Sequence, residues 1–168
     1  WQSMDMVIVN KFGTCVANWL YDNGFIDASI SFDHDFSYNI LEKCINIGTT
    51  SYPIVSKWFE EFLQKLGCEW HNIPEPVLCF LHELGHYNTI SDFSEDELVF
   101  FQFRKTLCGT INDDGDYQKE GMFEYWHVID ELAANDWEVE FINNNIEAVN
   151  ALIGIFDALW NDVKNEFN

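Results

Sequence analysis

The spacing of apolar residues is the feature that most restricts how this chain can fold. Over most of its length, large apolar side chains recur every three or four positions, which is typical of an α-helix with one buried face. On this basis we predict helices over residues 5–22, 52–66, 119–142 and 146–167. Residues 28–36 instead alternate apolar and polar side chains as a half-buried strand does. The pattern therefore predicts a mostly helical fold with little sheet.

The remaining segments complete a single α+β domain. Residues 39–47 alternate more loosely, and we expect them to pair with the first strand as a hairpin. Residues 98–107 follow a capping-box pattern, although their VFFQF run would also suit a strand. We expect one zincin-like domain over residues 4–168, with the small sheet before the helix that carries the motif described below. Residues 1–3 precede Met4, and we interpret them as a leftover of cloning.

Composition indicates a folded protein of the cytoplasm. The chain is 48% hydrophobic and 17% aromatic, which excludes a disordered protein. No apolar run is long enough to span a membrane, and no secretory signal precedes the first helix. The five cysteines are odd in number and show no disulfide framework, so we expect reduced thiols.

The net charge of the chain restricts the classes of molecule that it can bind. With 29 acidic and 8 basic residues, the formal net charge is -21, which repels nucleic acid. We therefore expect no direct nucleic-acid binding and no membrane partner. The remaining interpretations are attraction of a basic protein or a metal cation, imitation of the charge of DNA, or an acidic surface that serves only solubility.

The most informative motif lies in residues 80–87, which read FLHELGHY. His82-Glu83-Leu84-Gly85-His86 is an H-E-x-x-H pattern, on a helix that we expect to run from Pro76 to about Tyr87. Positions i and i+4 share a helix face, so both histidines could ligate one ion, with Glu83 beside them. The alternative interpretation is a core helix whose histidines are satisfied by hydrogen bonds.

Such a site suits hydrolysis by zinc. A catalytic zinc ion takes three protein ligands and keeps one position open for water, whose pKa falls to roughly 7. A neighbouring glutamate can then accept the proton of the water and pass it to the leaving amine. The motif therefore predicts Zn²⁺ as the cofactor, with Glu83 as the general base.

The third ligand has to come from elsewhere in the chain. A histidine six residues beyond His86 would complete a different arrangement, but that position is Asp92. Glu131 is the best candidate, because it lies within an apolar helical segment where an acid needs a partner. Asn135, one turn later on the same face, could accept the free N–H of a ligating histidine. A solvent-exposed helix acid is the alternative for Glu131.

Two segments together resemble a known family. His-Glu-Leu-Gly-His-Tyr at residues 82–87, followed by Glu-Leu-Ala-Ala-Asn-Asp-Trp at 131–137, is similar to the ImmA/IrrE-type zinc metallopeptidases of the gluzincin group. The resemblance covers about residues 76–141. It implies His82, His86 and Glu131 as zinc ligands and Glu83 as general base. It also implies an association with phages or mobile elements and, for some members, cleavage of transcriptional repressors.

Further side chains are candidates for stabilising an oxyanion or for binding a second ion. His127 lies one turn before Glu131 and could stabilise a developing oxyanion, so we include it as a catalytic candidate. Tyr125 and Tyr87 are alternatives for the same role. Residues 113–116 resemble half of a calcium loop but lack its later glutamate, and we interpret them as a plain loop.

The sequence thus leads to two functional hypotheses. The first is a zinc-dependent peptidase that hydrolyses a peptide bond in a protein substrate, such as a repressor or another basic protein. The alternative is an acidic binding protein, a DNA mimic or anti-defence inhibitor, whose zincin motif is inert or structural. A peptidase fold that has kept zinc but only recognises a partner would lie between the two.

Overall fold

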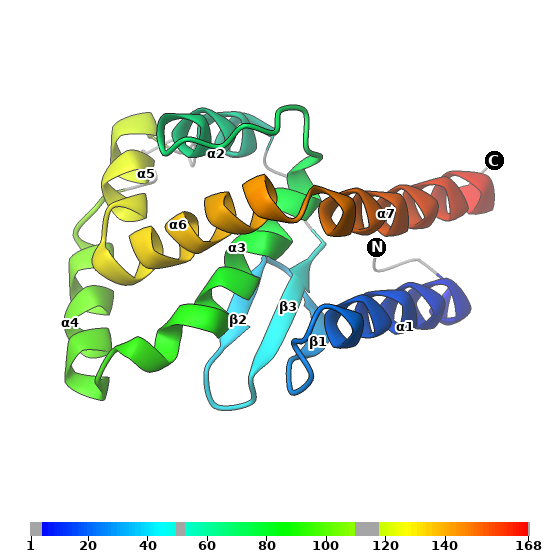
Figure 1. The fold of residues 1–168 in the computed structure, drawn as a ribbon, viewed down its shortest axis with the longest axis horizontal. Helices are drawn as coiled ribbons and strands as arrows, with labels where there is room; N and C mark the ends of the chain where they lie inside the picture. The colour runs from blue at the N-terminus through cyan, green and yellow to red at the C-terminus, as the bar shows by residue number, and fades with distance from the viewer. Residues whose placement is uncertain (1–4, 50–52, 110–117, 168) are drawn as a thin grey trace.

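The computed structural model describes residues 5–49, 53–109 and 118–167, which form seven α-helices, a short 3₁₀ helix and a three-stranded sheet (Figure 1). This confirms the predicted α+β class. In chain order the elements are α1 (Met6–Asp22), β1 (Ser29–Asp33), β2 (Ser37–Asn39), β3 (Cys44–Gly48), α2 (Pro53–Lys65), α3 (Glu75–Thr89), η1 (Ile90–Asp92), α4 (Glu95–Thr106), α5 (Lys119–Trp126), α6 (Ile129–Asn144) and α7 (Ile146–Phe167).

Helix α3 is the centre of the fold. It lies against strands β2 and β3 on one side and packs along α6 on another (Figure 1). Pro76 is compatible with the first turn of a helix, where its missing N–H has no intrahelical partner to lose. The N-terminal half of the helix is apolar, and Val77, Phe80 and Leu81 are completely buried. The core therefore surrounds the helix that carries the H-E-x-x-H motif.

The sheet corrects the predicted hairpin. The strand predicted over residues 28–36 does pair with part of 39–47, but β1 and β3 run parallel, with Ile30 opposite Ile45. The antiparallel partner of β3 is the short strand β2, with Tyr38 opposite Ile45. The chain turns after Asp33 and again near Lys43, whose φ of 50° is left-handed. The alternation of apolar side chains does not predict either of these reversals.

The prediction of one long helix over residues 119–142 is also wrong, because this segment forms two helices. Helix α5 ends at Trp126, and Val128, with φ -61° and ψ 139°, is extended before α6 begins. The break places Asp130 and Glu131 in the first turn of α6, where the helix dipole favours negative charge. Residues 98–107, left between helix and strand by their sequence, fall mainly in helix α4, behind an observed capping box of Ser94 and Glu97.

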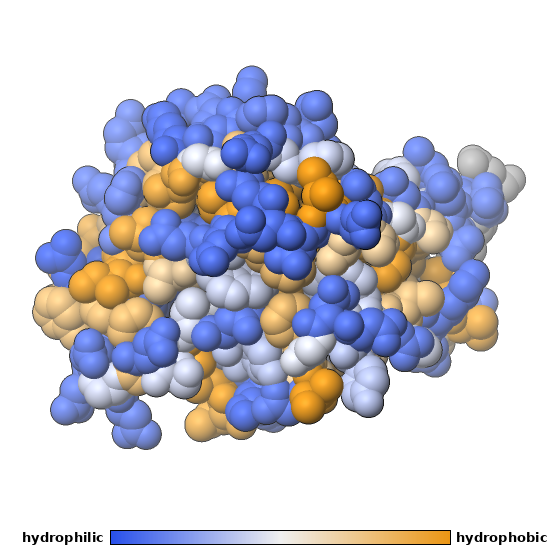
Figure 2. Space-filling model, in the orientation of Figure 1, coloured by the Kyte–Doolittle hydropathy of each residue, from blue (hydrophilic) through white to orange (hydrophobic). Residues whose placement is uncertain are grey.

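The first and last helices close the core on the side away from α4. Helices α1 and α7 lie side by side (Figure 1), and the indole N–H of Trp19 donates to the carbonyl of Ala148 at 2.9 Å. Hydrophilic side chains cover much of the face in Figure 2, but apolar atoms gather at the left edge, over α4. No helix in the described part of the chain combines the length and hydropathy needed to cross a membrane.

Candidate metal centre

The two motif histidines lie together on the buried face of α3. His82 and His86 are 9% and 7% exposed, and their ring centroids are 4.8 Å apart. The helix fits closely against α6 at Gly85, where an added Cβ would lie 2.5 Å from the carbonyl oxygen of Ala134. A glycine is therefore required for α6 to approach the histidines this closely, and the small side chain of Ala134 completes the contact.

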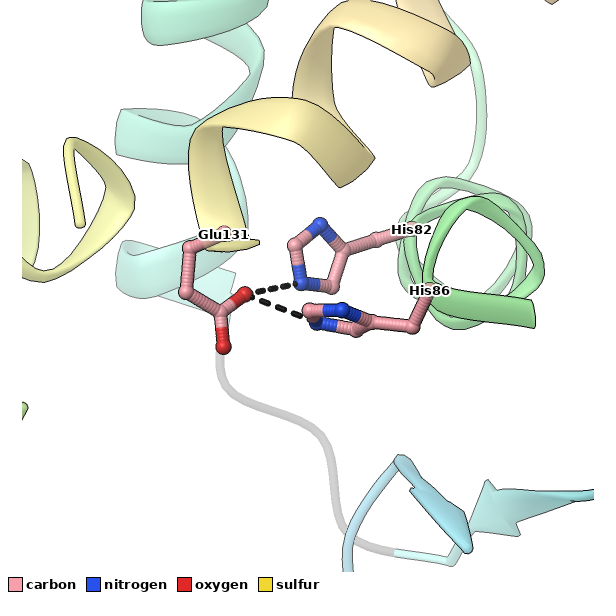
Figure 3. A group of neighbouring side chains, drawn as sticks. All are labelled: His82, His86 and Glu131. Atoms are coloured by element: carbon pink, nitrogen blue, oxygen red, sulfur yellow. Dashed lines mark hydrogen bonds and ion pairs between the residues drawn. The ribbon is translucent and has the colours of Figure 1, made fainter. Parts of the chain in front are cut away.

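Helix α6 brings Glu131 to the histidines from the opposite side (Figure 3). Its Oε2 lies 2.7 Å from Nε2 of His82 and 2.9 Å from Nε2 of His86. All three side chains are buried, and one ligand atom of each lies within 4.8 Å of those of the other two. This arrangement could hold a metal ion, as expected from the motif and the later helix.

Asn135 orients the His82 ring. Its Oδ1 lies 2.7 Å from Nδ1 of His82, and its amide nitrogen donates to the carbonyl of Trp126 at 3.2 Å. Because the amide is held by that second bond, its oxygen faces the ring and Nδ1 of His82 carries hydrogen. Nε2 is then directed at Glu131. This hydrogen bond is the one predicted for Asn135, and such partners typically set the tautomer of a ligating histidine.

The charges of the site favour a bound cation. Burial alone would lower the pKa of His82, but the charge of Glu131 and its hydrogen bond outweigh burial and raise that pKa to about 10. Burial also acts to raise the pKa of Glu131, yet the two histidines hold it well below its usual range. The metal-free site therefore keeps a carboxylate and attracts positive charge, which either a proton or a metal ion can supply.

A cavity of about 640 Å³ opens in front of this group. Its walls come from separate parts of the chain: the segment at β2, helices α2, α3 and α4, the C-terminal part of α5 and the first turn of α6. Glu83 lines the cavity beside the histidines, and burial raises the pKa of its carboxyl. A carboxyl with raised proton affinity next to the candidate ligands is the group that general-base chemistry needs.

The three candidates for oxyanion stabilisation fall in different places. Tyr125 lines the cavity. Burial, with the charge of Glu131 and a hydrogen bond to it, raises the pKa of its phenol. His127 is not brought to the cavity: its Nδ1 lies 2.6 Å from the carbonyl of Phe123, and its ring packs on Phe62. Tyr87 instead donates a hydrogen bond to Asp27. The helix break before α6 is the physical reason that His127 departs from the face of Glu131.

Sequence reasoning missed Lys105, which also lines the cavity. Its Nζ lies 2.6 Å from Oδ2 of Asp130 and 2.9 Å from Oε1 of Glu131. Burial alone would lower the pKa of Lys105, but these carboxylates outweigh burial and raise it, so the ammonium stays charged. No local pattern marks this lysine, because it pairs with a helix that follows much later in the chain. The calcium-like residues 113–116 lie outside the described residues.

Comparisons with known proteins add no family assignment. No protein-family model, curated protein or solved structure matches this chain.

Glu138 is a second buried acid on α6. It is completely buried, and neither carboxyl oxygen has a hydrogen-bond partner among the residues that the structure describes. Burial raises its pKa well above the ordinary value of 4.5, an effect that the positive charge of His82 only partly offsets. Glu138 is therefore protonated over a range of pH where an exposed glutamate is ionised.

We expect a Glu138→Gln variant to become more stable, relative to the unchanged protein, as the pH rises. Below about pH 4.5 both folded and unfolded states bind the proton of Glu138, so this carboxyl costs no stability there. Above it, the unfolded state releases that proton first, and stability falls by up to about 1.4 kcal/mol per pH unit. Urea unfolding with a chelator present, from pH 5 to 8, measures the difference.

The matched control is Glu140→Gln, an exposed position on the same helix. The gap in unfolding free energy between the Glu138→Gln variant and the unchanged protein should widen with pH, and that of the control should not. A gap that stays constant over this range would mean that the carboxyl of Glu138 ionises normally in the folded protein.

Proposed function

We propose that this protein is a zinc-dependent peptidase. The observation that carries the proposal is the buried group of His82, His86 and Glu131 at the wall of a cavity that Glu83 also lines. Two imidazole nitrogens and one carboxylate oxygen are a ligand set of catalytic zinc sites, in which three protein ligands leave one position open. The likeness of the motif and of α6 to the ImmA/IrrE-type peptidases supports the same function.

The residues present fit a zinc ion. The three ligand atoms converge from two helices, and Asn135 holds His82 with Nε2 directed at the shared point. When bound, zinc would supply a Lewis acid that makes water acidic and polarises a carbonyl group. Buried ligands hydrogen-bonded by further residues are typical of sites that hold such an ion firmly.

Two cavity residues have roles in hydrolysis. In this proposal the carboxylate of Glu83 accepts a proton from the attacking water and returns it to the nitrogen of the leaving amine. The hydroxyl of Tyr125 keeps its proton, because its pKa is raised, and by exchanging its hydrogen bond to Glu131 it can donate to the oxygen that becomes negative. Tyr125 replaces His127 here, since it is the one of the two that lines the cavity.

An extended peptide has a place to bind along the cavity. In the sheet order β1-β3-β2, strand β2 is an edge strand, and Phe36, Ser37 and Tyr38 at this edge line the cavity. The outer edge of such a strand presents backbone groups that can pair with an added strand. A peptide laid along β2 would pass in front of the histidines, which supports a protein or peptide as the substrate.

The charge of the chain favours a basic substrate. At a formal net charge of -21, long-range attraction speeds the encounter with a positively charged protein, such as the DNA-binding region of a repressor. This attraction is screened over roughly 10 Å at 0.1 M salt. We therefore expect zinc-loaded protein to cleave basic substrates with a higher kcat/KM than neutral ones, and the advantage to fade as salt rises, with kcat little changed.

The test uses two matched peptide substrates that share one cleavage sequence and differ only in flanking lysines or serines, assayed from low to high salt. Equal kcat/KM at low salt would mean that the acidic surface does not select the substrate. Failure of the zinc-loaded protein to cleave either peptide or a panel of DNA-binding proteins, combined with tight and salt-sensitive binding to one of them, would favour the acidic binding protein instead.

A further inference from the structure

The buried cation of the cavity belongs to an element outside the motif helices. Lys105 lies in the last turn of α4, and its side chain is 10% exposed, while the carboxylates of Asp130 and Glu131 that it contacts are 7% and 4% exposed. Water therefore screens these contacts little, in contrast to the ion pairs on the surface. Lys105, Asp130 and Glu131 therefore keep their relative positions more firmly than an exposed ion pair does.

The two oxygens of Glu131 have different neighbours. Oε2 faces the Nε2 atoms of His82 and His86, at 2.7 and 2.9 Å. Oε1 lies 2.9 Å from Nζ of Lys105. The hydroxyl of Tyr125 also hydrogen-bonds this carboxylate. A carboxylate can bind a metal ion through one oxygen or through both, and here the second oxygen is already engaged by an ammonium group.

Asp130 holds the ammonium group in this position. Its Oδ1 accepts a hydrogen bond from the backbone N–H of Glu131 at 2.9 Å, and its Oδ2 lies 2.6 Å from Nζ of Lys105. The ammonium group of Lys105 therefore cannot move from Oε1 to Oε2 of Glu131 without breaking its ion pair with Asp130. Asp130 also balances the charge of Lys105, so the three residues together still offer one negative charge to a metal ion.

We propose that Lys105 is a positioning residue that restricts Glu131 to coordination through Oε2 alone. This inference rests on the metal centre proposed above. Coordination by one oxygen keeps the number of protein ligand atoms at three, which leaves room for water and for a substrate carbonyl. If Lys105 only joined α4 to α6, its loss would change stability but not the coordination of the metal.

The test replaces zinc with Co²⁺, whose visible absorption bands weaken as its coordination number rises. The variants are Lys105→Met and Lys105→Met/Asp130→Ala, the second of which removes the acid that would otherwise be buried without a cation. Lys105→Arg restores a cationic donor, and Lys119→Met removes an exposed lysine paired with Glu61 at 3.1 Å. Circular dichroism and cobalt stoichiometry are measured on each protein.

We expect every folded protein to bind one Co²⁺, with bands at least twofold weaker in the two Lys105→Met variants and unchanged in Lys105→Arg and Lys119→Met. Bands of unchanged intensity in a folded, cobalt-loaded Lys105→Met/Asp130→Ala variant would overturn the positioning role and leave the metal centre intact. Failure of the unchanged protein to bind Co²⁺ or Zn²⁺ would instead overturn the metal centre itself, and the positioning role with it.

Discussion

A His82→Ala variant should fold and bind zinc at least about 100-fold more weakly than the unchanged protein. Loss of a partner that only hydrogen-bonds a ligand typically costs 10–100-fold in metal affinity, and loss of the ligand itself should cost more. The unchanged protein should hold one metal ion per chain after dialysis, and the variant close to none. Elemental analysis and competition with a chelator measure both quantities.

His71→Ala is the matched control, because His71 is an exposed histidine outside the cavity. Metal binding should also release protons at neutral pH, since His82, with its pKa raised to about 10, is protonated in the metal-free protein. Affinity should therefore fall as the pH is lowered. A metal content in the His82→Ala variant equal to that of the control would show that the ion binds elsewhere.

The second large effect is expected at Glu83. A Glu83→Gln variant should keep its fold and its zinc, and lose about 100-fold or more in kcat, because an amide cannot accept the proton of water. The glutamine has nearly the same size and still fits beside His82 and His86 on α3. The readout is kcat on the best basic substrate, together with zinc stoichiometry on the same samples.

Glu140→Gln, exposed on α6, serves as the control for the loss of one negative charge. It should reduce kcat/KM only slightly and leave kcat unchanged. Parental kcat in a zinc-loaded Glu83→Gln variant would mean that another group accepts the proton. Loss of zinc in that variant would mean that Glu83 supports the metal rather than the reaction.

The local periodicity of the sequence determined the parts of the site that lie within single helices. A spacing of four residues places His82 and His86 on one face of α3, and the same spacing places Glu131 and Asn135 on one face of α6. The capping box of Ser94 likewise predicts where α4 begins. Which residues share a face of one helix, and where that helix begins, depend on local helix geometry alone. Residue spacing in the sequence therefore predicts both.

The tertiary structure alone decided the rest. The extended backbone at Val128 breaks the predicted long helix, turns His127 away from the cavity and places Glu131 in a first turn. The parallel pairing of β1 with β3 depends on two chain reversals. Lys105 reaches Glu131 because α4 packs beside α6. Packing between helices distant in sequence depends on the whole core. No local sequence pattern therefore predicts that Lys105 pairs with Glu131.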